Sequence, residues 1–110
     1  MQKGFFRVTD VRAFEELSER SRSKPVVILK HSTTCPMSAA AYREMSTFEG
    51  EVALVEVQRA RELSREIENK TGIKHESPQI LILRNGQVVW DASHFQITSE
   101  AVTKAVSNNA

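Results

Sequence analysis

The sequence predicts an α/β fold in which one mixed, open β-sheet carries helices on both faces. Over most of the 110 residues, apolar strand-like runs alternate with segments of helical periodicity. Residues 26–30 form a β-branched run that is apolar on both faces, as a central strand requires. Asn85-Gly86, between two apolar runs, is a strong signal for a two-residue hairpin, and therefore for one antiparallel strand pair.

Each element follows from a local pattern in the chain. The expected strands are residues 5–8, 26–30, 52–57, 79–84 and 87–91. The expected helices start after a cap at Thr9 or Asp10, at Pro36, at Ala60 and after the cap Thr98. Their core-facing residues are Val11, Phe14 and Leu17, then Met37, Ala41, Met45 and Phe48, then Leu63 and Ile67, then Val102, Ala105 and Val106. The order β-α-β-α-β-α-β-β-α resembles the thioredoxin fold.

Composition narrows the class of protein. The length is that of a single domain, so we expect residues 1–110 to form one thioredoxin-like domain. The formal net charge of +1 and the interspersed charges provide no basic stripe for nucleic acid, and no apolar run approaches a membrane span. One cysteine cannot form an internal disulfide, and residues 1–6 do not resemble a secretory signal, so we expect a cytoplasmic protein.

Cys35 is the residue on which a chemical function depends. It lies between the expected central strand and the helix that begins at Pro36, so it is expected to cap that helix. The N–H groups of Met37 and Ser38 would then point toward its sulfur, and the helix dipole would favour the thiolate. The Ser38 hydroxyl could add a donor. The alternative is a small, buried core cysteine without redox chemistry.

The stretch from Thr34 to Ser38 occupies the place of a Cys-x-x-Cys redox motif whose second cysteine is replaced by Ser38. A dithiol enzyme releases its mixed disulfide by attack of its own second cysteine. With no second cysteine in the chain, Cys35 needs an external thiol, so the sequence predicts one-thiol disulfide exchange.

Pro78 follows Ser77 just before the strand that enters the hairpin. The thioredoxin fold places a cis proline facing the reactive cysteine at this point, so we expect a cis Ser77-Pro78 bond that turns the Ser77 backbone toward a substrate. The alternative is an ordinary trans proline at the start of an edge strand. The three histidines and the cysteine lack zinc-site spacing, so no metal is expected.

These motifs together resemble the monothiol bacilliredoxins over about residues 8–106. The stretches that carry the resemblance are Lys30-His31-Ser32-Thr33-Thr34-Cys35-Pro36, Ser38-Ala39-Ala40-Ala41, His75-Glu76-Ser77-Pro78-Gln79, and Ser93-His94 before Ile97-Thr98. Met37 stands where relatives often carry a branched aliphatic residue. This departure leaves the cysteine chemistry intact.

The resemblance implies a function: removal of bacillithiol from S-thiolated cytosolic proteins. Cys35 would attack the mixed disulfide, become bacillithiolated, and be regenerated by free bacillithiol and a flavin disulfide reductase. Bacillithiol would be a co-substrate, with no bound cofactor. Thr34, Ser77, Pro78 and His94 are the expected substrate-binding residues, and the helix start near Thr98 could receive the malyl carboxylates.

Three alternatives remain open from the sequence. A glutathione-linked monothiol glutaredoxin is disfavoured, because a glycine after the cysteine and a Gly-Gly pair near the last helix are absent. An iron–sulfur carrier would use two copies of Cys35, but nothing else marks cluster binding. A redox-inactive adaptor with the same fold would bury Cys35.

Overall fold

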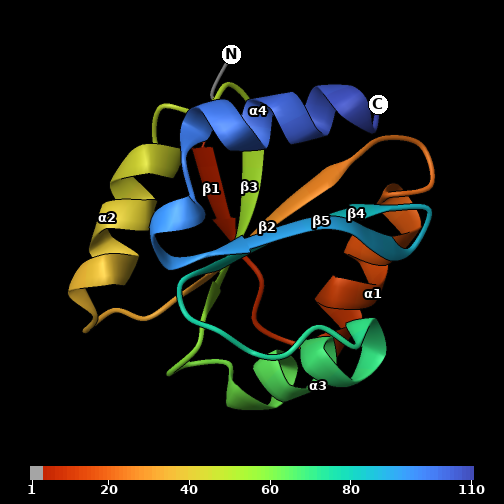
Figure 1. Ribbon diagram of the computed structural model, residues 1–110. Helices are drawn as coiled ribbons and strands as arrows, with labels where there is room; N and C mark the ends of the chain where they lie inside the picture. Colours follow the sequence, from red (N-terminus) through yellow and green to blue (C-terminus); the bar gives the residue numbers. More distant parts are fainter. Residues whose placement is uncertain (1–3) are drawn as a thin grey trace.

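The computed structural model describes residues 4–110, which form a five-stranded sheet and four α-helices (Figure 1). The strands are β1 (Gly4–Arg7), β2 (Val26–His31), β3 (Glu51–Glu56), β4 (Gln79–Arg84) and β5 (Gln87–Ser93). The helices are α1 (Val11–Arg20), α2 (Pro36–Met45), α3 (Arg61–Thr71) and α4 (Ser99–Asn108), with a short 3-10 helix, η1 (His94–Gln96), before α4. The predicted α/β class and the order of its elements are confirmed.

The strand order across the sheet is β1-β3-β2-β4-β5, so β2 is central and β1 and β5 are the edges. Strands β1 and β2 run parallel to β3, whereas β4 runs antiparallel to both β2 and β5. The sequence predicted one antiparallel pair, at the hairpin, and missed the pairing of β2 with β4. The reason is the segment 72–78, which runs back beside the sheet before β4 begins, as Figure 1 shows. Seven residues can cover up to about 24 Å, which is enough to reverse the expected strand direction.

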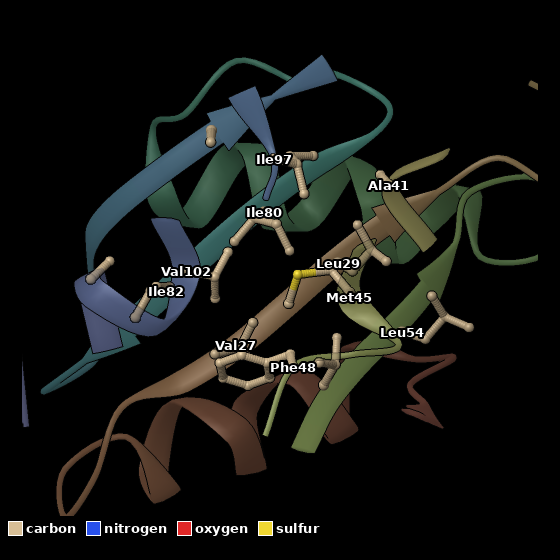
Figure 2. Packing of buried hydrophobic residues seen from close by; sticks show 13 residues of the cluster. Val27, Leu29, Ala41, Met45, Phe48, Leu54, Ile80, Ile82, Ile97 and Val102 are labelled. Atoms are coloured by element: carbon tan, nitrogen blue, oxygen red, sulfur yellow. The ribbon is translucent and has the colours of Figure 1, made fainter. Parts of the chain in front are cut away.

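Two apolar clusters pack on opposite faces of this sheet. Because side chains alternate along a strand, Val27 and Leu29 face α2 and α4, while Val26 and Ile28 face α1 and α3. Figure 2 shows the first cluster, in which Met45 of α2 packs among strand and α4 side chains. Both faces of β2 and β4 are therefore covered, which explains their continuous apolar runs.

Local capping agrees with the predicted starts of α1 and α4. The Asp10 carboxylate accepts the Ala13 N–H at 2.8 Å, and the Thr98 hydroxyl accepts the Ala101 N–H at 3.1 Å. Gly72, with φ of 74°, ends α3 in the left-handed conformation that glycine adopts most readily. The helix η1 was not predicted, because three residues carry no helical periodicity.

Met37 is the one member of the predicted α2 stripe that lies outside the core. Ser38, Ala41 and Met45 are the buried residues of α2, and Phe48 is buried just beyond it. Met37, in the first turn of α2, is half-buried and lies two residues after Cys35. Within residues 4–110, no helix has the length and apolar character needed to span a membrane.

Candidate active site

Cys35 lies where the chain leaves the central strand β2 and enters α2. Its backbone is extended, with φ of −102° and ψ of 124°, and it is the N-cap residue of the helix, with Pro36 at the first helical position. The thiol is free and half-buried, so it is open to reagents. A buried core cysteine, as the adaptor alternative requires, is not what the fold presents.

The start of α2 favours the thiolate form of Cys35. The backbone N–H of Ser38 has the largest effect in lowering the pKa of Cys35 below its ordinary value, opposed by partial desolvation. The Met37 N–H and the Ser38 hydroxyl lower the pKa further. The neutral sulfur accepts no capping hydrogen bond of full geometry. These donors therefore act mainly on the charged form, which attracts N–H groups more strongly than a thiol does.

Ser38 links the cysteine to the preceding loop. Its side chain is fully buried, and its Oγ accepts the N–H of Ser32 at 3.1 Å. Since Ser38 Oγ is the acceptor in this bond, its hydroxyl hydrogen remains free to be donated to Cys35. The residue that replaces a second cysteine therefore supports the first one and cannot resolve its disulfide.

The Ser77-Pro78 peptide bond is cis, as expected from the sequence. The Pro78 carbonyl accepts the His94 N–H at 3.1 Å, and His94 Nε2 lies 3.5 Å from Oε1 of Glu76. His94 also lines a surface pocket with Met37 and Phe95, which places it on the Cys35 side of the molecule. Phe95 is 80% exposed, and the sequence did not single it out.

Gln58, just after β3, organises the loop that precedes Cys35. Its Nε2 donates to Ser32 Oγ at 2.7 Å and to Thr34 Oγ1 at 3.1 Å, while its Oε1 accepts the Thr33 N–H at 3.1 Å. Thr34, predicted as a substrate contact, is exposed and has its hydroxyl within this network. Sequence inspection missed Gln58, because a lone glutamine 23 residues beyond the cysteine has no distinguishing pattern.

Lys30 is a second residue whose role the sequence did not reveal. It is fully buried on the α3 side of β2, and its Nζ has no hydrogen-bond partner among residues 4–110. Burial lowers the pKa of Lys30 to about 8, against the opposing effect of Glu68 and Glu76. A charged residue at the end of an otherwise apolar run was the available signal.

The other two histidines, His31 and His75, contact side chains of neighbouring helices. His31 packs against the Tyr42 ring, and burial lowers its pKa against the raising effect of Glu56. His75 Nδ1 lies 3.3 Å from Ser64 Oγ, and burial and then Lys30 lower its pKa. Across the described part of the chain, 4–110, no cluster of three or more acidic, histidine or cysteine side chains could hold a metal.

The start of α4, considered for the malyl group, already has an anion beside it. The Glu44 carboxylate accepts the Ser99 N–H at 2.9 Å, while the Thr98 hydroxyl is occupied by its cap bond to Ala101. A second carboxylate there would meet the charge of Glu44.

Comparison with known proteins agrees with this geometry. The family model described as monothiol bacilliredoxin BrxC matches residues 7–102. The chain belongs to the monothiol bacilliredoxin family. This bacilliredoxin is also similar to a solved structure described as a candidate oxidoreductase with a thioredoxin fold, at 35% identity, a TM-score of 0.85 and 92% coverage of each chain.

Two thioredoxins show how widely the fold is shared. The bacilliredoxin is 16% identical to reduced Schistosoma mansoni thioredoxin pre-protein, with a TM-score of 0.72. The match covers 99% of the bacilliredoxin and 100% of the thioredoxin chain. It is 12% identical to a mutant thioredoxin from Halobacterium salinarum, with a TM-score of 0.73. This match covers 96% of the bacilliredoxin and 90% of the thioredoxin chain. At such identities the likeness concerns the fold alone. Family and fold together make this bacilliredoxin a thiol-redox protein of the thioredoxin-like oxidoreductase class.

Proposed function

We propose that this protein removes bacillithiol from protein mixed disulfides, with Cys35 as the catalytic nucleophile. The observation that carries the proposal is the accessible thiol at the start of α2, whose pKa is lowered by the Ser38 and Met37 N–H groups. Ser38 in place of a second cysteine supports a cycle that depends on an external thiol.

The reaction is two successive thiol–disulfide exchanges. The Cys35 thiolate attacks the bacillithiol sulfur of the mixed disulfide, the old S–S bond breaks, and the protein leaves as a thiolate that takes up a proton. A bacillithiol thiolate then attacks the bacillithiol sulfur on Cys35, which releases the Cys35 thiolate and bacillithiol disulfide. Each exchange forms one disulfide for the one that it breaks, so neither exchange reduces bacillithiol disulfide. That reduction requires a separate flavin disulfide reductase.

A mass-transfer experiment tests this function. A test protein carrying one bacillithiol mixed disulfide is incubated with wild type or with Cys35→Ala, and intact masses are recorded. We expect the bacillithiol mass to move to the wild type alone. No transfer, or equally rapid transfer from a glutathione mixed disulfide, would contradict the proposed specificity.

His94 is proposed to contact the substrate beside the sulfur. The His94→Ala variant should lower the rate of bacillithiol transfer, because it removes the side chain that faces Glu76 and lines the pocket with Met37. The reactivity of Cys35 toward iodoacetamide should not change. An unaltered transfer rate would remove His94 from the site.

A further inference from the structure

A pocket of about 400 Å³ opens on the α3 side of the loop that leads to Cys35. Among its lining residues are Ser32, Gln58, Arg61, Arg65, Glu68 and His75. Its volume falls within the range of small-molecule sites. None of its residues figured in the expected substrate contacts, which are Thr34, Ser77, Pro78 and His94.

The lining of the pocket carries more positive than negative charge. Arg61 and Arg65 project from the first turns of α3, and within the described residues 4–110 neither forms an ion pair. Glu68 is the one carboxylate of the lining, and it also attracts the buried Lys30 ammonium, whose pKa it raises. Glu76 is the second carboxylate that attracts Lys30. Its Oε1 lies 3.5 Å from His94 Nε2.

Lys30 adds an observation independent of the surface arginines. Its fully buried Nζ has no hydrogen-bond partner in the part of the chain that the structure describes. It also lies close enough to His75, on the pocket wall, to lower the pKa of that residue. The buried Lys30 cation and the guanidinium groups of Arg61 and Arg65 together make this pocket electrostatically suited to an anion.

The pocket is coupled to the reactive cysteine through Ser32 and Gln58. Both line the pocket, and both hydrogen-bond to Thr34, the neighbour of Cys35. Cys35 is the third residue after Ser32, so their Cα atoms lie at most about 11 Å apart. A small molecule joined to Cys35 through its sulfur can therefore reach the edge of the pocket at Ser32.

We infer that this pocket binds the carboxylates of the small-thiol half of the mixed disulfide, with Arg61 and Arg65 as the specificity-determining residues. The inference deepens the proposed function and rests on it for the identity of the thiol. Planar guanidinium groups recognise carboxylates with two parallel hydrogen bonds. The one carboxylate of the pocket lining, Glu68, is offset by two arginines, whereas Glu44 already accepts an N–H at the start of α4.

The test compares two mixed disulfides of one test protein, one with bacillithiol and one with the uncharged 2-mercaptoethanol. In the Arg61→Gln/Arg65→Gln variant, kcat/KM for bacillithiol transfer to Cys35 should fall about five- to tenfold through a higher KM. Transfer from the 2-mercaptoethanol disulfide should stay unchanged. The matched control is Arg22→Gln/Lys104→Gln, which removes the same charge from exposed positions away from the pocket.

A second measurement does not depend on bacillithiol. The ratio of Cys35 alkylation rates by anionic iodoacetate and neutral iodoacetamide should fall in the Arg61/Arg65 variant and not in the control. If that ratio falls while wild type takes up no bacillithiol, the proposed function fails and the anion pocket stands. Three results would overturn the pocket inference. The first is an equal fall in kcat/KM for both mixed disulfides in the Arg61/Arg65 variant, and the second is an equal fall in the control variant. The third is a kcat/KM and an alkylation ratio that do not change in the Arg61/Arg65 variant.

Discussion

At the scale of single residues, Cys35 depends on the two positions that follow Pro36. Position 38 has a double role, because its backbone N–H and its hydroxyl both favour the Cys35 thiolate. The sequence predicted this arrangement, since a cysteine before a proline-initiated helix leaves little choice for the direction of the next N–H groups.

The Ser38→Ala variant isolates the hydroxyl contribution. The pH at which Cys35 alkylation reaches half its maximal rate should rise, because one donor to the thiolate is lost while the Ser38 backbone N–H remains. Stopped-flow alkylation with iodoacetamide across pH measures this. The control is Ser46→Ala at the other end of α2, whose hydroxyl donates to the Arg43 carbonyl. An unchanged midpoint in Ser38→Ala would show that the hydroxyl does not act on the sulfur.

Lys30 makes a prediction about stability and pH. Its folded-state pKa of about 8 lies below the unfolded value of 10.5, so the folded protein binds this proton more weakly than the unfolded chain does. The destabilisation is complete below pH 8 and disappears as the pH rises toward 10.5.

The Lys30→Met variant should therefore raise the free energy of unfolding at pH 7 by about 1–3 kcal/mol. This gain should shrink when urea denaturation is repeated at pH 9 and pH 10. Lys104→Met, at an exposed position of α4, serves as the control and should show no such trend. A gain independent of pH would mean that packing, and not the buried charge, explains the effect.

At the scale of elements, the helices and strands follow from local patterns, and most boundaries agree within one or two residues. The direction of β4 relative to β2 did not follow. It depends on the path of segment 72–78 beside the sheet, which no periodicity encodes. Gln58 was missed for a related reason, because its partners lie 24 to 26 residues earlier in the chain.

Gly72, where α3 meets that segment, offers a test of backbone conformation alone. Its φ is 74°, and a methyl group added at its Cα would meet nothing within 4 Å. The Gly72→Ala variant should therefore lose about 1 kcal/mol of unfolding free energy through left-handed strain without a steric clash. Gly72→Asn should lose less, because asparagine tolerates this region. Chemical denaturation that finds both variants as stable as wild type would refute the conformational explanation.

At the scale of the whole molecule, the sheet divides the apolar interior into two clusters. Ile80 lies in the cluster under α2 and α4, and Ile67 lies in the cluster under α1 and α3. Both side chains are almost completely buried. Since each cluster touches the same central strands, loss of one is expected to unfold the other.

Paired truncations test this division. Ile67→Val and Ile80→Val should each lower the free energy of unfolding by about 0.5–1.5 kcal/mol. The double variant should lose the sum to within about 0.5 kcal/mol, because the sheet lies between the two sites. A single transition by fluorescence and circular dichroism is expected for all three variants. Two separate transitions, or strong non-additivity, would contradict a shared sheet with independent clusters.

The amino-acid sequence alone determined the α/β fold, the position of Cys35 at the start of a helix, the serine in place of a second cysteine and the cis proline. All of these depend on neighbours within a few residues or on the order of the elements. Only the tertiary structure decided which distant groups surround the site: Gln58 on the cysteine loop, Lys30 close to His75, and two arginines in the pocket that Ser32 also lines. Their roles arise from proximity in space, and proximity between remote residues depends on how the helices pack across the sheet, which local sequence does not specify.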